Sequence, residues 1–205
     1  RTWKKILPDT KLQSKEMLQM AYKPNLQYII NRSVRMSVLI IGGAGYIGSH
    51  TVKYFLEKNE DVVIVDNLLT GHEEALQTDK FYNCDIRDKE SLDKVFKENN
   101  IEAVVHFAAN SLVGESMVKP YEYYHNNVYG MMCLLDVMKE NNVDKIVFSS
   151  TAATYGEPKN IPILESDETN PTNTYGETKL AMEKMMKWFD KAYNTKYVSL
   201  RYFNA

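Results

Sequence analysis

The sequence has few cysteines, no basic surplus and no long apolar run, and each absence argues against a class of protein. The two cysteines, Cys84 and Cys133, lie in apolar surroundings without a Cys-x-x-Cys spacing, so we expect buried reduced thiols, no disulfide and no metal site. The formal net charge of -2 argues against a nucleic-acid binder, because such domains usually carry a positive surplus that displaces counterions from phosphates. No apolar run approaches the roughly 18 to 20 residues of a membrane span, and no secretory signal is recognisable. We therefore expect a soluble, cytoplasmic protein with no membrane or nucleic-acid partner.

Charged residues are unevenly distributed along the chain. Residues 1–35 carry eight Lys or Arg and two Asp or Glu, whereas residues 36–205 carry 17 and 25. We expect residues 1–35 to be a basic tail outside the fold and residues 36–205 to form one domain. Upstream sequence read into the chain is the favoured explanation of the tail, with a transit peptide or a binding arm as alternatives. Because the sequence begins with Arg and stops at "LRYFNA", directly after an expected strand, we expect a fragment with an incomplete domain.

From Met36 onward, apolar strand patterns alternate with helical patterns, which is typical of a parallel α/β sheet. We expect strands at residues 37–42, 61–66, 80–85, 101–109, 144–150 and 196–203. We expect helices at residues 45–59, 88–99, 121–142 and 175–194. The strands are continuously apolar, as strands covered by helices on both faces must be.

The stretch "IIGGAGYIGSH", residues 40–50, lies between the first expected strand and the first expected helix. Gly42, Gly45 and Gly48 are three apart, and Gly43, Gly45 and Gly48 also satisfy the pattern G-x-G-x-x-G. In this position, glycines let the backbone turn tightly and approach a pyrophosphate at the start of a helix. Asp66 ends the second strand about 20 residues later, where its carboxylate binds ribose hydroxyls and repels a 2'-phosphate. The sequence therefore predicts a Rossmann-type doubly wound parallel sheet that binds NAD rather than NADP, and disfavours a glycine turn without a ligand.

Two further stretches carry groups suited to proton transfer. Tyr175 and Lys179 are four residues apart at the start of an expected helix, so both side chains share one face. A phenol near a Lys ammonium and a cationic nicotinamide becomes a base at neutral pH once its pKa falls by about three units. Ser149, Ser150 and Thr151 lie at the end of an expected strand, on the side where ligands of parallel sheets bind. A lone Tyr-x-x-x-Lys arises often by chance, so this pattern needs its context.

Two histidines are expected to be structural. His106 lies inside an apolar strand and is expected to be a core residue with its hydrogen bonds satisfied. His125 is expected on a helix surface.

The sequence resembles the extended short-chain dehydrogenase/reductases, and among them the UDP-glucose 4-epimerase family in particular. The resemblance is carried by nine motifs in the family's order, from Met36 to the last residue: "GGAGYIGSH", "DNL", "DIRD", "VVHFAA", "VGES", "YYHNNVYG", "FSSTAATYGE", "NPTNTYGETK" and "LRYFN". They cover only the amino-terminal part of the family's chain. The resemblance therefore implies that a carboxyl-terminal substrate domain is missing and that this fragment could be inactive alone.

The resemblance implies reversible epimerisation at C4 of UDP-glucose and UDP-galactose, in galactose metabolism. Tyr175 would remove the 4-hydroxyl proton while hydride passes from C4 to tightly held NAD, and both would return to the other face of a 4-keto sugar. Thr151 would bridge the sugar 4-oxygen and Tyr175, and Lys179 would lower the phenol pKa and bind the nicotinamide ribose. Asn204 matches a residue that reaches the UDP-sugar. Further cofactor contacts are implied at Gly42, Gly45, Tyr46, Ile47, Gly48, Asp66, Asn67, Leu68, Leu69, Thr70, Gly71, Asp85, Ile86, Phe107, Ala108, Ala109, Asn110, Ser111, Asn127 and Phe203.

Several alternatives stay open at this point. A related 4,6-dehydratase is disfavoured, because its acid/base pair would fall on Ala152 and Ala153, which cannot transfer a proton. Epimerases of UDP-N-acetylhexosamines or UDP-pentoses remain possible, as does a non-catalytic NAD-binding regulator, although regulators usually lose the Tyr/Lys pair. Ile41 and Ser111 depart from residues common in the family and are expected to weaken cofactor contacts slightly. The family also implies a homodimer formed through the expected helices near residues 121–141 and 175–194.

Overall fold

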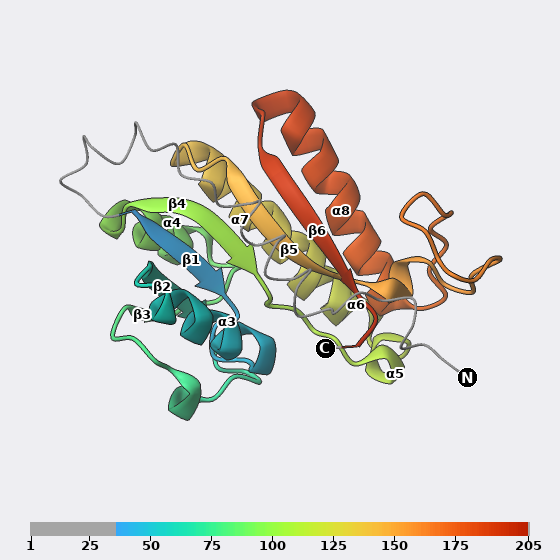
Figure 1. Cartoon of the computed structure of the whole chain (residues 1–205), viewed down its shortest axis with the longest axis horizontal. Helices are drawn as coiled ribbons and strands as arrows, with labels where there is room; N and C mark the ends of the chain where they lie inside the picture. The colour runs from blue at the N-terminus through green and yellow to red at the C-terminus, as the bar shows by residue number, and fades with distance from the viewer. Residues whose placement is uncertain (1–35, 205) are drawn as a thin grey trace. The chain divides into compact units, whose positions relative to one another are not determined.

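The computed structural model describes residues 36–204, and the expected tail at residues 1–35 lies outside them. Within that range, parallel strands form one sheet in the order β3-β2-β1-β4-β5-β6 (Figure 1). The strands are β1 (Ser37–Ile41), β2 (Asp61–Asp66), β3 (Phe81–Asn83), β4 (Ile101–His106), β5 (Lys145–Thr151) and β6 (Lys196–Tyr202). Strand order runs outward from β1 in one direction and from β4 in the other, which confirms the predicted doubly wound sheet. The carboxyl ends of β1 and β4 are therefore the switch point, where such sheets bind ligands.

Helices cover both faces of the sheet. The longer ones are α3 (Tyr46–Glu57), α4 (Lys89–Glu98), α7 (Gly130–Glu140) and α8 (Thr174–Tyr193). Leu39 and Ile41 of β1 belong to an apolar cluster with side chains of α4, α7 and α8. Val38 and Ile40 belong to the opposite cluster, together with Val52 of α3. Successive side chains of β1 thus pack into two different cores, one on each face of the sheet. This packing fixes the end of β1, where the glycine loop begins.

The start of α8 is set by a cap. The Asn173 side chain accepts a hydrogen bond from the Gly176 N–H at 2.8 Å, which satisfies one of the free donors at the helix start. The helix therefore begins at Thr174 and places Tyr175 in its first turn. Lys179 follows one turn later on the same face.

The helix predicted over residues 121–142 is present without a gap from residue 120 to residue 140, but its winding changes along its length. The chain forms α5 (Val113–Ser116), then α6 (Pro120–Tyr123), a π-helical segment η3 (Tyr124–Tyr129) and α7. A π turn carries more residues than an α turn, so it changes which side chains face inward, and such segments are frequent at functional sites. This change of winding decides which of two neighbouring asparagines in η3, Asn126 and Asn127, faces the ligand side of the sheet.

The prediction that both cysteines are buried thiols is confirmed. Cys84 and Cys133 are buried free thiols. Met131 is fully buried in the core, whereas Met132 beside it is 51% exposed. Among residues 36–204, no helix is long and apolar enough to cross a membrane, and no group of three or more His, Cys, Asp or Glu side chains is placed to hold a metal ion.

Candidate functional site

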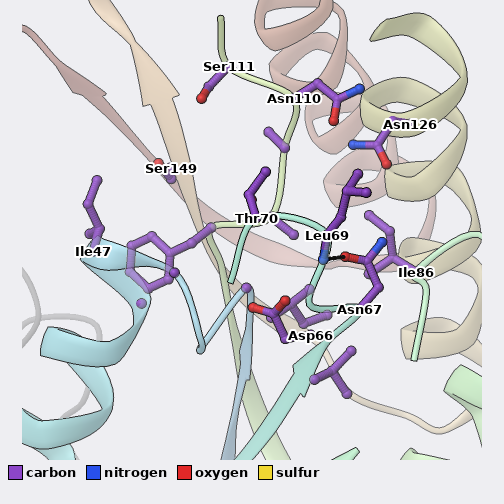
Figure 2. A pocket seen from close by; sticks show the side chains of 18 of the residues that line it. Ile47, Asp66, Asn67, Leu69, Thr70, Ile86, Asn110, Ser111, Asn126 and Ser149 are labelled. Atoms are coloured by element: carbon purple, nitrogen blue, oxygen red, sulfur yellow. Dashed lines mark hydrogen bonds between the residues drawn. The ribbon is translucent and has the colours of Figure 1, made fainter. Parts of the chain in front are cut away.

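A cavity of about 290 Å³ opens where β1, β2 and β4 end (Figure 2). Most of the predicted cofactor-binding residues line it: Gly42, Gly45, Tyr46, Ile47, Gly48, Asp66, Asn67, Leu69, Thr70, Ile86, Phe107, Ala108, Ala109, Asn110 and Ser111. They come from the glycine loop, from the loops after β2 and β4, and from the segment after β3. The structure thus brings four separate predicted segments to one place, at the switch point of the sheet.

At two positions of the glycine loop, a side chain would collide with the backbone. Gly42 has φ 80°, and a Cβ there would lie 2.6 Å from the backbone nitrogen of Ala108. A Cβ on Gly48 would lie 2.0 Å from the carbonyl oxygen of Gly42. Gly45 is different, because its nearest neighbour would be 3.4 Å away and its φ is -79°. As the N-cap of α3, Gly45 contributes no side-chain cap, and the first turn holds no acid, so the N-terminal end of the helix suits an anionic ligand.

Asp66 connects the glycine loop to the loop after β2. One carboxylate oxygen accepts a hydrogen bond from the Ala44 N–H at 3.0 Å, and the other accepts one from the Leu68 N–H at 2.9 Å. Leu68 itself does not line the cavity and has φ 56°, while Gly71 packs beside Asp66 and Ala44. Figure 2 shows Asp66 beside the glycine loop, at the edge of the cavity. Its carboxylate therefore shapes both loops while it remains part of the cavity wall.

The predicted adenine contacts divide into two roles. Ile86 lines the cavity, whereas Asp85 does not. The Asp85 carboxylate accepts hydrogen bonds from Arg87 at 2.6 and 2.8 Å and from Asn67 at 3.2 Å. The hydrogen bonds from Arg87 hold the pKa of Asp85 well below its usual range. Arg87 also contacts the exposed His125, which lies on the helix surface as predicted. Asp85 thus holds Asn67 and Arg87 in place beside the cavity.

The three predicted catalytic residues lie together next to β5. Lys179 is 2% exposed, and its Nζ donates a hydrogen bond to the Ser149 carbonyl at 2.7 Å. The same Nζ lies 5.8 Å from the centre of the Tyr175 ring and 4.8 Å from that of Phe148. A hydrogen bond joins Tyr175 to the side chain of Thr151. None of the three predicted residues lines the cavity, but Ser149 does, so the cluster adjoins the cavity through this residue.

In the chain by itself, burial governs the phenol pKa of Tyr175. Burial raises the pKa of Tyr175 above its ordinary value of 10, and the hydrogen bond with Thr151 opposes this rise only in part. The Lys179 Nζ lies 5.8 Å from the centre of the Tyr175 ring and donates its hydrogen bond to the Ser149 carbonyl. Burial also lowers the pKa of Lys179 to about 7, which reduces its positive charge at neutral pH. The predicted lowering of the phenol pKa requires a cationic nicotinamide beside Tyr175 as well as the lysine, so it stays a prediction for the cofactor-bound protein.

Three other predicted residues lie outside the cavity lining. Asn127 is fully buried, and its amide hydrogen-bonds to Asn110 and Thr178 instead of facing the cavity. Phe203 and Asn204 follow β6, and both are exposed. The structure brings together the predicted substrate contacts Thr151 and Tyr175, and Asn204 lies two residues after Tyr202, which pairs with Thr151 across β5 and β6.

The motifs missed three cavity residues, Val65, Cys84 and Asn126. The sequence gives no sign that Val65 and Cys84 line a cavity. Both lie in short apolar segments, and an apolar side chain there can face either a cavity or the core. Burial raises the pKa of the Cys84 thiol to about 11, so this group is neutral in the wall. Asn126 directly precedes the predicted Asn127, and only the turn of η3 decides which of the two faces the cavity.

His106 is a core residue, as predicted, but the expectation that its hydrogen bonds are satisfied is wrong. It is 1% exposed, and neither ring nitrogen has a hydrogen-bond partner. Its ring lies 5.8 Å from that of Phe148. Burial, assisted by the charge of Lys179, lowers the pKa of His106 to about 3, so the ring is neutral under ordinary conditions.

Comparison with known proteins gives consistent results. Residues 38–205 match the model of the NAD dependent epimerase/dehydratase family. The chain is 61% identical over 170 residues to the UDP-glucose 4-epimerase of Halalkalibacterium halodurans. The alignment covers 83% of this chain and 51% of that protein. A crystal structure of UDP-glucose 4-epimerase from Brucella ovis in complex with NAD gives a TM-score of 0.81 at 44% identity. One from Bifidobacterium longum in complex with NAD+ and UDP gives 0.80 at 45% identity.

The two structural matches cover 82% of this chain and 52% and 53% of those chains. The chain therefore spans about half the length of the relatives it matches. The resemblance on which the sequence analysis relies is confirmed. Because the family model extends over most of the chain and reaches every strand of the described sheet, this chain belongs to the NAD-dependent epimerase/dehydratase family.

Proposed function

We propose that this chain is the cofactor-binding and proton-transferring part of a UDP-glucose 4-epimerase, and that it holds NAD in the cavity at the switch point. The glycine loop is the observation that carries this proposal. The carbonyl oxygen of Gly42 lies so close to Gly48 that no side chain fits at Gly48. Gly45 lines the cavity, and a Cβ there would only be in ordinary contact with the same oxygen. Directly behind it, α3 begins without a side-chain cap. A loop of this kind suits a ligand with negatively charged phosphate groups.

The residues around the cavity fit the cofactor. The N-terminal end of α3 would hold the pyrophosphate, and Asp66 would bind the adenosine ribose. Each Asp66 oxygen accepts one backbone hydrogen bond and so retains a lone pair for a ribose hydroxyl. The negative charge of Asp66 disfavours a 2'-phosphate, which supports NAD over NADP. When bound, NAD supplies a reversible hydride acceptor for the substrate.

Within this proposal, the chain's own residues move the proton. Tyr175 takes the proton from the sugar 4-hydroxyl and later returns it, while the Thr151 hydroxyl holds the same oxygen. Because burial raises the pKa of Tyr175, the phenol ionises only when positive charge beside it outweighs the effect of burial. Lys179, fixed by the Ser149 carbonyl with its Nζ 5.8 Å from the centre of the Tyr175 ring, can provide part of that charge.

The test uses a completed enzyme, in which residues 36–205 are joined to the carboxyl-terminal part of the Halalkalibacterium halodurans relative. We expect it to convert UDP-galactose to UDP-glucose without added reductant. Tyr175→Phe is expected to lower kcat by about 10³-fold while NAD stays bound, because the proton acceptor is lost. Tyr54→Phe, in α3 and away from the cavity, is the matched control and should keep full activity. Full activity of Tyr175→Phe would remove this residue from the mechanism.

The same assay separates the alternatives. Parallel reactions contain UDP-N-acetylgalactosamine or a UDP-pentose in place of UDP-galactose. Turnover of one of these alone would assign the chain to an epimerase of another UDP-sugar. Binding of NAD with no turnover of any sugar would favour a non-catalytic regulator.

We further propose that the complete protein is a homodimer. Large apolar side chains are exposed on η3, α7 and α8: Tyr129 (44%), Met132 (51%), Trp188 (63%) and Tyr193 (53%). When such exposed apolar side chains lie together on a surface, they often mark an interface. Sedimentation of the completed enzyme should give a dimer, and Trp188→Lys should shift it toward a monomer. A monomer in the unsubstituted protein would exclude this assembly.

A further inference from the structure

The side chain of Asn127 makes every hydrogen bond that an amide can make. Its oxygen accepts from the Asn110 N–H at 2.8 Å and from the Asn126 side chain at 3.0 Å. Its nitrogen donates to the Asn110 carbonyl at 3.0 Å and to the Thr178 hydroxyl at 3.1 Å. The residue is fully buried. An amide has two donors and two acceptor sites, so this side chain has none left for a ligand.

The π-helical segment gives the two consecutive asparagines opposite roles. Asn126 lines the cavity, whereas Asn127 points away from it into the protein. Figure 2 shows Asn110 and Asn126 close together in the upper part of the cavity. The second asparagine is therefore placed behind the cavity wall, and the first belongs to that wall.

Thr178 continues the connection to the catalytic turn. It is fully buried and lies between Tyr175 and Lys179 in sequence. Its hydroxyl accepts the hydrogen bond from Asn127 and donates one to the Tyr175 carbonyl at 2.8 Å. An unbroken path of hydrogen bonds thus runs from the backbone of Asn110, in the cavity wall, to the backbone of Tyr175.

We propose that Asn127 is a positioning residue, which fixes the turn carrying Tyr175 and Lys179 against the cavity wall at Asn110. This inference rests on the proposed function, and it replaces the direct cofactor contact predicted for Asn127. A fully satisfied, buried polar network is rigid, because every alternative geometry leaves a polar group without a partner. Catalysis depends on such rigidity, since small misplacements of a proton acceptor reduce the rate of transfer. Asn127 therefore acts on the reaction through Thr178 and on the cofactor through Asn110.

The two connections can be tested separately in the completed enzyme. Thr178→Val keeps the shape of the side chain and removes only the connection to α8. We expect kcat to fall about tenfold, with KM and the Kd for NAD within about twofold of the unsubstituted enzyme. Thr178→Ser restores the hydroxyl and should recover kcat. Asn127→Ala also releases Asn110, so it should lower kcat and weaken NAD binding together. The double variant should have the kcat of Asn127→Ala alone, because both changes break the same path.

Thr51→Val is the matched control, because the Thr51 hydroxyl donates only to the Ile47 carbonyl, at 3.0 Å, in α3. It should keep the kcat of the unsubstituted enzyme. If circular dichroism shows that Thr178→Val does not fold, Asn127→Asp carries the test from the other end, since it keeps the shape but loses both donated bonds. An active parent enzyme with unchanged kcat in the folded variant would overturn the inference. An inactive parent enzyme that binds no NAD would instead overturn the proposed function.

Discussion

Replacing single glycines by alanine tests the assignment of the cavity and separates two effects of one added methyl group. In Gly48→Ala, the Cβ would lie 2.0 Å from the Gly42 carbonyl oxygen, and ordinary contact begins at 3.4 Å. The start of α3 and the loop must therefore separate by about 1.4 Å, and the atom in the way belongs to the backbone. Strain of this kind costs about 3 kcal/mol, which for a chain of this size lowers Tm by roughly 6 to 12 °C.

Gly45→Ala should behave differently, because its Cβ meets only the Gly42 oxygen, at 3.4 Å, and its φ is open to alanine. We expect an unchanged Tm. NAD binding should weaken by at least tenfold, since the new methyl group enters the cavity that Gly45 lines. Gly114→Ala, with no atom within 4 Å of its Cβ, is the control and should change neither quantity.

Differential scanning calorimetry and isothermal titration with NAD measure the two quantities on the same samples. An unchanged NAD affinity in Gly45→Ala would refute the placement of the cofactor in this cavity. An unchanged Tm in Gly48→Ala would refute the tight loop geometry. The comparison is informative because the three substitutions add the same group.

Three further predictions concern charged and titratable groups. His106 has a pKa of about 3 against an ordinary 6.5, so the unfolded chain binds a proton that the folded chain does not, and this group lowers stability by about 1.4 kcal/mol per unit as pH falls below 6.5. Between pH 7.5 and 5, the free energy of unfolding measured with urea should therefore fall by about 2 kcal/mol less in His106→Leu than in the unsubstituted protein. An equal fall in both proteins would contradict a neutral buried ring. Glu183 pairs with Arg201 at 2.6 Å with side chains only 10% and 22% exposed, so Glu183→Gln should cost about 3 kcal/mol in urea unfolding, whereas Glu168→Gln, in an exposed pair, should leave stability unchanged. Asp66→Ser should weaken NAD and strengthen NADP in binding titrations; an unchanged ratio of the two affinities would mean that Asp66 does not contact the ribose.

The fold was predictable because its signals are local. Each described strand falls within a predicted range, except that β5 extends one residue further, to Thr151, since buried parallel strands are short apolar runs that the sequence displays directly. The start of α4 was also visible, because Asp88 caps it by accepting from the Ser91 N–H at 3.1 Å. The π-helical segment at 124–129 was not, because the apolar residues of a π turn fit a helical spacing equally well. Within this segment, Asn127 bonds to Asn110 and Thr178, and these contacts are not contained in any local pattern.

The site was predictable where backbone shape sets the residue type. Gly42 and Gly48 are required by close contacts within and beside the loop, so the motif reports geometry directly. The direction of a side chain is a different matter. Lys179 shares a helix face with Tyr175, as its spacing indicates, yet its Nζ binds the Ser149 carbonyl, which lies 30 residues earlier in the chain. Sequence spacing shows which groups are close, whereas the partners that each group selects depend on the assembled fold.

The ionisation of Tyr175 and the charge of Lys179 are therefore best treated as one event. Burial alone disfavours both charged forms, since it raises the pKa of the phenol and lowers that of the ammonium to about 7. A phenolate at Tyr175 would raise the pKa of Lys179, and a protonated Lys179 would lower that of Tyr175 by the same free energy, because the interaction is mutual. The neutral His106 adds no competing charge beside them. The chain by itself thus disfavours both charges, and a cationic ligand next to Tyr175 would favour the phenolate and, through it, the protonated lysine.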